Sequence, residues 1–127
     1  MEVRKFNGLA FQGDIALLAI GKLPDGCNKV TQKLNSSDRE AYGYHLEKGL
    51  VLAQGESRNH YHAFRNINNV NMYEKIENKK RHLYLVVDNT INLVHEEHDA
   101  IEVTPNVYEL FFQSEYTFEE EYVRVAD

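Results

Sequence analysis

The stretch LYLVVDNTINLV, residues 83–94, decides the fold class, because apolar and β-branched residues fill both of its halves. Leu83–Val87 predicts a strong strand, and Ile91–Val94 predicts a second one after Asp88–Asn89, a dipeptide that favours turns. We therefore expect a strand, a tight turn, and a strand that returns along the first. The chain carries no convincing helical periodicity that would compete with this interpretation.

Upstream of this stretch, runs of strand length alternate with turn residues. Val70–Ile76 has apolar spacings that suit a helix or a strand, and the plausible turn Glu77–Lys80 favours a hairpin with Leu83–Val87. The other strands expected here are Val3–Phe11 with a break at Gly8, Ile15–Ile20, Lys29–Leu34, Glu40–Glu47 and Leu50–Ala53.

Downstream, further short strands are expected at Ala100–Val103, Val107–Phe112 and Tyr122–Val125. Several short strands with closely spaced turns are typical of a β-sandwich or a barrel. The length of 127 residues suits one domain. We therefore predict an all-β, mostly antiparallel fold, built as a single small barrel or β-sandwich domain over residues 1–127.

Composition argues against several classes of function. The chain has 20 acidic and 14 basic residues, a net charge of −6, which argues against nucleic-acid binding through a basic face. No apolar run approaches the ~18 residues of a membrane span. The single Cys27 forms no internal disulfide, which fits a reducing interior. We expect a cytoplasmic protein with no membrane and no nucleic-acid partner.

Four of the six histidines fall in two short segments, and the first of these is Gly55–His62. His60 and His62 are two residues apart, so on a strand both imidazoles point to the same face. Imidazole suits zinc, copper, iron and nickel, and the pair would supply half of a site for such a divalent transition metal. The same parity places Glu56 on that face, as a ligand, an orienting group or a general base.

The second segment is His95–His98, in which the two histidines are three residues apart and do not match strand parity. They would converge on the first pair if the chain bends at Glu96–Glu97. A bend is expected there, because one predicted strand ends at Val94 and another begins at Ala100. Three histidines with an open position would make a site of the catalytic type, and four would make a closed, structural one.

Acid–base chemistry at such a site would fall to Glu96 or Glu97, besides Glu56. An interpretation without metal stays open for both segments. A His-x-His pair also occurs on exposed strands, and His95–His98 would then be a polar surface turn whose local charge pairs contribute little to stability.

The residues around His60 and His62 resemble the first cupin motif, in which a glycine precedes a His-x-His pair that enters a β-barrel. Ile101–Pro105 resembles the approach to the second cupin motif. The resemblance implies a cupin-like barrel that binds a metal. It carries the ligand role to His60 and His62 only, since Arg65 and Asn66 occupy the region of the cupin glutamate.

The second cupin motif is also incomplete, because Val107 stands at the position of its glycine and no histidine follows. The third ligand would therefore come from His95 or His98.

A closer resemblance covers most of the chain and is to small uncharacterised proteins of bacteria and their phages. It implies a shared fold and adds no reaction. The motifs that carry it, in order, are Gln12-Gly13-Asp14, Gly55-Glu56 with His60 and His62, His95-Glu96-Glu97-His98, Pro105 with Tyr108, and Gln113 with Glu115-Tyr116.

Two functions follow from these observations. The first is a metal-binding, cupin-like domain with a small-molecule ligand, and whether it is an enzyme stays open. The second is a non-enzymatic accessory or assembly protein of a phage or bacterium that forms a homo-oligomer through exposed strand edges. The second is motivated by a large aromatic supply: Tyr42, Tyr44, Tyr108, Phe111, Phe112, Tyr116 and Tyr122.

Overall fold

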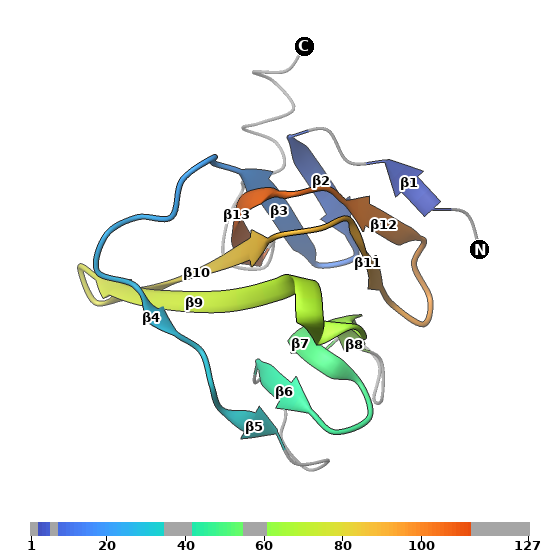
Figure 1. Ribbon diagram of the computed structural model, residues 1–127, viewed down its shortest axis with the longest axis horizontal. Helices are drawn as coiled ribbons and strands as arrows, with labels where there is room; N and C mark the ends of the chain where they lie inside the picture. The colour runs from blue at the N-terminus through green and yellow to red at the C-terminus, as the bar shows by residue number, and fades with distance from the viewer. Residues whose placement is uncertain (1–2, 6–7, 35–41, 55–60, 113–127) are drawn as a thin grey trace.

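The structure is a computed structural model that describes residues 3–5, 8–34, 42–54 and 61–112. These residues form two β-sheets and one short 3₁₀ turn, η1 (Ile67–Asn69), as Figure 1 shows. The predicted all-β, mostly antiparallel class is confirmed. Within the described part of the chain, no helix is long and apolar enough to cross a membrane.

The first sheet, called sheet A, has seven strands among the described residues. Pairing is antiparallel except for β1 with β12 and β5 with β6, which are parallel. The strands in spatial order are β1 (Val3–Lys5), β12 (Ala100–Val103), β11 (Ile91–Val94), β8 (Tyr61–Phe64), β7 (Gly49–Gln54), β6 (Gly43–His45) and β5 (Lys33–Leu34).

The second sheet, called sheet B, has six strands among the described residues, all of them antiparallel to their neighbours. In spatial order they are β2 (Leu9–Gln12), β3 (Ile15–Ala19), β13 (Asn106–Phe112), β10 (Lys80–Val87), β9 (Val70–Glu77) and β4 (Asn28–Lys29).

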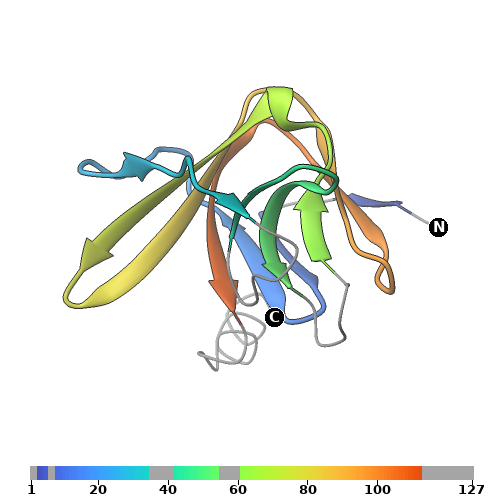
Figure 2. The same cartoon turned by 90° about the horizontal axis from the view of Figure 1, so that it is seen from below.

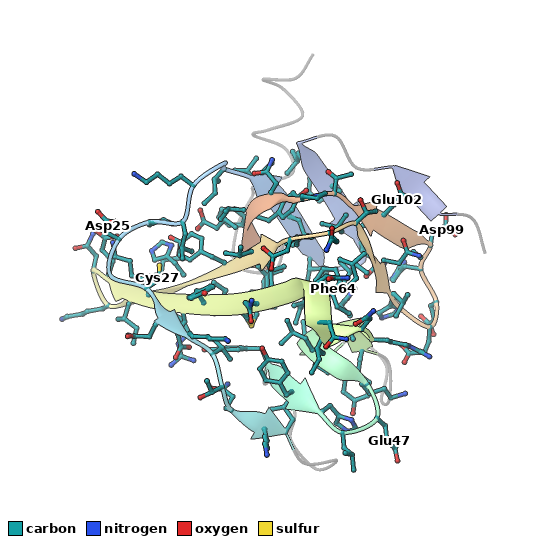
Figure 3. All side chains as sticks on the ribbon, in the orientation of Figure 1. Asp25, Cys27, Glu47, Phe64, Asp99 and Glu102 are labelled. Carbon is teal, nitrogen blue, oxygen red and sulfur yellow. The ribbon has the colours of Figure 1, made fainter. Side chains whose placement is uncertain are left out.

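One hydrophobic core joins the two sheets. Sheet A contributes Leu52 and Phe64, and sheet B contributes Leu17 and Leu85, all at most 1% exposed. Phe64 lies near the middle of the molecule (Figure 3). Each such side chain contributes about 1.5–3 kcal/mol on burial. The shared core makes the molecule a sandwich rather than two separate sheets.

Strand β8 is buried on both of its faces. Phe64 belongs to the main core, whereas Tyr61 and Ala63 pack with Val51 in a second, smaller cluster. The predicted parity is confirmed in this respect, since Tyr61 lies on the face opposite to Phe64.

The expected hairpin between β9 and β10 is confirmed. Its register runs from Lys80↔Glu77 to Val87↔Val70, and Asn78 and Lys79 form the turn with φ of 53° and 65°. Two consecutive left-handed residues are the requirement of a type I′ turn, whose twist matches that of the strands. The hairpin extends well beyond the other strands (Figure 2).

The predicted return of Ile91–Val94 along Leu83–Val87 is wrong. β10 pairs with β9 and β13 in sheet B, whereas β11 pairs with β8 and β12 in sheet A. A tight hairpin turn needs left-handed residues, and among the described residues other than glycine only Asn78 and Lys79 adopt them. The turn after β10 instead leads the chain across the sandwich, held by a 2.8 Å bond from Asp88 N to Asn69 O.

The predicted strand Lys29–Leu34 is also wrong as one element. It divides into β4 in sheet B and β5 in sheet A, because Val30 is buried in the core between them and its N donates to Met72 O.

One N-terminal prediction shifts, and three others match. Gly8 lies in a bend outside β1 and β2, as predicted, whereas β2 extends through Gln12, which was expected in a turn. Ile91–Val94 and Ala100–Val103 are strands with the predicted bounds. Part of the predicted Glu40–Glu47 strand appears as β6, and Tyr122–Val125 lies outside the described residues.

Candidate metal centre

The register between β11 and β8 brings two histidines together. Leu93 pairs with Phe64 and Val94 with Ala63, so the next step of the same ladder places His95 opposite His62. Their ring centroids are 4.4 Å apart. His62 is 0% and His95 4% exposed, so both imidazoles are buried.

His98 lies next to these two histidines because of the bend that the sequence predicted. The chain bends at Glu96–His98, which confirms the expectation, and returns as β12. The ring of His98 lies 4.7 Å from that of His95 and 6.4 Å from that of His62. Two buried imidazoles and one exposed imidazole therefore gather at the end of β8.

The turn between β2 and β3 reaches this histidine cluster from sheet B. Asp14 Oδ1 lies 2.9 Å from His62 Nε2. Gly13 has a φ of 57°, and a Cβ on it would lie 2.8 Å from His98 Nε2 and 3.2 Å from His62 Cε1. Glycine is therefore needed both for the left-handed backbone and for the close approach of the turn.

The amide of Gln12 fixes the protonation of His62. Gln12 is 1% exposed, and its Nε2 donates to Leu93 O at 3.0 Å and to Asp99 O at 2.9 Å. Its Oε1 therefore faces His62 Nδ1, at 2.8 Å, and can only accept. His62 thus carries a proton on Nδ1, and in the neutral ring the lone pair of Nε2 points to Asp14.

His95 has the opposite arrangement. The backbone N of Glu97 donates to His95 Nδ1 at 3.0 Å, so Nδ1 holds the lone pair and the proton of the neutral ring is on Nε2. In this arrangement His95 presents an N–H group to the cluster, and His62 presents a lone pair.

Burial lowers the pKa of His62 to about 4, and the neighbouring His95 adds to this effect. The hydrogen bond and the charge of Asp14 act to raise the pKa, and they do not outweigh burial. His62 is therefore uncharged at neutral pH, and its contact with Asp14 brings two electron-pair donors together.

The three glutamates named from the sequence have different positions. Glu96 Oε2 accepts from Tyr61 N at 2.8 Å, and Oε1 lies 3.7 Å from Lys48 Nζ. Burial acts to raise the pKa of Glu96, but the hydrogen bonds from Tyr61 and from its own backbone, together with Lys48, give a net lowering. Glu96 thus connects the His95–His98 bend to β8 through the hydrogen bond from Tyr61 N.

The side chain of Glu97 is exposed, whereas its backbone N binds His95. Glu56 and His60 lie outside the described residues. Cys27, at the far end of the molecule from Asp99, takes no part in the cluster (Figure 3).

Among the described residues, no group of three or more His, Cys, Asp or Glu side chains is arranged to hold a metal ion. His62 and Asp14 supply two donor atoms side by side, with His98 next to them.

Reasoning from the sequence missed Gln12 and Asp14 as members of this cluster. Gln12-Gly13-Asp14 was interpreted as a turn, and β2 extends through Gln12. No spacing along the chain links it to His62, which is 48 residues from Asp14.

Comparison with known proteins places the chain in a family. No curated protein and no solved structure matches it. A family model described as "Domain of unknown function (DUF8820)" matches residues 11–113, which include both histidine segments and the turn before β3. The chain therefore belongs to the DUF8820 family.

Proposed function

We propose that this protein is a metal-binding domain whose centre lies at the end of β8, with His62 as its main ligand. The hydrogen bond between Gln12 and His62 Nδ1 carries the proposal. Metal-ligating histidines almost always donate their other ring N–H to an oxygen atom, which fixes the tautomer and aims the lone pair at the ion. Gln12 performs this role for His62.

The protonation state of His62 also supports the proposal. A histidine ligand must be neutral, and burial keeps His62 neutral at physiological pH. His60, which lies outside the described residues, is the second ligand that the sequence predicts, and His98 would reach the same ion from the bend. His95 would donate its Nε2–H to a group near the ion rather than bind it.

The bound ion would supply Lewis acidity, by which an oxygen atom of a small molecule is polarised or a water molecule is activated. Zinc, iron, nickel and copper all suit imidazole ligands. The cupin resemblance also implies a metal held by a His-x-His pair at the entrance of a β-barrel. The small molecule would be oriented by Glu97, whose side chain is exposed in the bend beside the cluster.

Metal analysis of protein purified without a histidine tag tests this function. We expect one equivalent of Zn(II) to bind in calorimetry, and His60→Ala or His62→Ala to weaken binding at least tenfold. His82→Ala is the matched control, because His82 lies in sheet B and contacts Glu109 at 3.2 Å. Absence of binding by the wild-type protein, or equal binding by all variants, would refute the proposal.

Assembly is a second candidate, supported by exposed apolar side chains on two elements. Leu46, in the turn before β7, is 99% exposed, and Ile76, near the tip of the β9–β10 hairpin, is 66% exposed. Exposed apolar side chains of this size mark interaction sites, because packing against a second copy removes them from water. Light scattering should then give a multiple of the monomer mass, and a strict monomer would exclude assembly.

A further inference from the structure

We propose that Asp14 is the carboxylate ligand of the metal centre, which makes it a mixed histidine–carboxylate site. The inference rests on the proposed function above and adds a residue from sheet B to it. The carboxylates named from the sequence were Glu56, Glu96 and Glu97, all close to the histidines along the chain. Asp14 is 48 residues away from His62 and is adjacent only in space.

The spacing of the two donor atoms supports this role. His62 Nε2 and Asp14 Oδ1 are 2.9 Å apart. Two ligands that each lie ~2.1 Å from one ion are ~3.0 Å apart at the right angles of octahedral coordination and ~3.4 Å apart at tetrahedral angles. The two side chains are therefore already at the separation of neighbouring ligands.

The hydrogen bonds around His62 decide which nitrogen of its neutral ring faces Asp14. Gln12 uses both of its amide hydrogens on Leu93 O and Asp99 O, so it must accept from His62 Nδ1. In the neutral ring, Nε2 then offers a lone pair to the Asp14 carboxylate, which also only accepts. A proton or a cation must join two such groups, and a divalent ion satisfies both of them.

The different exposure of the two ligands would let solvent and a small molecule reach the ion from one side. His62 is fully buried, whereas the side chain of Asp14 is 32% exposed. The ion would thus be held from the inside by imidazole and approached by solvent past Asp14. Mixed histidine and carboxylate ligands favour a borderline divalent ion such as Zn(II) or Fe(II), with open positions for a small molecule that carries oxygen donors.

Asp14→Asn tests the inference, because it keeps the shape of the side chain and removes its charge. We expect calorimetry with Zn(II) to show at least tenfold weaker binding by Asp14→Asn than by the wild-type protein. Asp25→Asn is the control, since Asp25 lies in an exposed turn at the other end of the molecule (Figure 3) and should bind as the wild type does.

The outcomes separate the two proposals. Binding by the wild-type protein and equal binding by Asp14→Asn would overturn the role of Asp14 and leave the histidine centre in place. Absence of binding by the wild-type protein would overturn both.

A second measurement does not depend on the folding of the variant. In the wild-type protein with ¹³C-labelled aspartate, saturation with Zn(II) should shift the carboxylate resonance of Asp14 and leave that of Asp25 in place. An unmoved Asp14 resonance at saturation would overturn the inference.

Discussion

Gln12 shows how one side chain sets the chemistry of another. An amide has a donor end and an acceptor end, and the two backbone carbonyls at Leu93 and Asp99 decide which end faces His62. A buried polar group that loses its partner costs about 1–3 kcal/mol. The orientation of the amide is therefore held by free energies larger than thermal energy, and so is the tautomer of His62.

Gln12→Met is expected to destabilise the fold and to weaken the metal centre. It keeps the volume of the side chain but leaves two carbonyls and His62 Nδ1 unpaired, a loss of about 3 kcal/mol in urea unfolding with a chelator present. Zn(II) affinity should fall 10–100-fold, as for other residues that orient a ligand. Gln32→Met is the control, because Gln32 is exposed and donates to Tyr42 O. Equal stability of the two variants would contradict the prediction.

Tyr42 should make stability depend on alkaline pH. Burial raises its pKa to about 12, and Glu74, which accepts a hydrogen bond from the hydroxyl, adds to the rise. The folded state keeps a proton that the unfolded state loses above pH ~10, so stability is full below pH ~10 and falls as the pH approaches ~12. The difference in unfolding free energy between the wild type and Tyr42→Phe should shrink by about 2 kcal/mol over this interval. A difference in unfolding free energy that does not change with pH would refute this role of Tyr42.

At the scale of elements, the β9–β10 hairpin was predictable because its information is local. Alternating residues flank a short polar turn, and Asn78 and Lys79 adopt the left-handed backbone that the turn requires. The passage from β10 to β11 was not predictable in this way. Its local turn chemistry suits a hairpin, and only the packing of the two sheets determines that the second strand joins sheet A.

The candidate site also has a part that was predictable from the sequence and a part that was not. The convergence of His95 and His98 on His62 followed from a bend between two predicted strands, which the structure contains. Asp14 and Gln12 were missed because they reach the cluster from the other sheet. No spacing along the chain encodes a contact between residues 48 positions apart.

Gly13→Ala should weaken metal binding more than it weakens the fold. A left-handed alanine costs roughly 1–2 kcal/mol. The added Cβ would press on the exposed ring of His98, which can move aside, and would lie 3.2 Å from Cε1 of the buried His62. Gly21→Ala has a similar φ of 80° with nothing within 4 Å of the new Cβ, so it carries the same backbone cost alone. We expect similar thermal unfolding for the two variants, and Zn(II) affinity at least tenfold lower for Gly13→Ala. Equal Zn(II) affinities of the two variants would contradict the placement of Gly13 beside the proposed metal centre.

Glu96→Ala should release the bend that carries His95 and His98. It removes the acceptor of Tyr61 N and the contact with Lys48, which together contribute about 1 kcal/mol in a partly exposed position. Amide hydrogen exchange should become faster across residues 95–99. Glu77→Ala, which removes an exposed contact with Lys75, is the control and should leave exchange in that segment unchanged. Unchanged amide hydrogen exchange in Glu96→Ala would show that the bend does not depend on the contacts of Glu96.

At the scale of the whole molecule, the two sheets depend on one core. Leu52→Ala should destabilise the protein by about 2–5 kcal/mol, since the side chain is fully buried between the sheets. Unfolding followed by circular dichroism and by tyrosine fluorescence should give a single, coincident transition. Ile76→Ala, at an exposed position, should change stability by less than about 0.5 kcal/mol. Separate transitions for the two signals would indicate sheets that fold independently.

The side chain of Gln12 crosses from the edge of one sheet to the backbone of the other, over sequence separations of 81 and 87 residues. Contacts so distant along the chain form late, since the intervening loop must close first. Until these contacts form, His62 has neither a fixed tautomer nor a neighbouring carboxylate. In the proposed metal centre, selection among ions would therefore begin only once the two sheets have packed together.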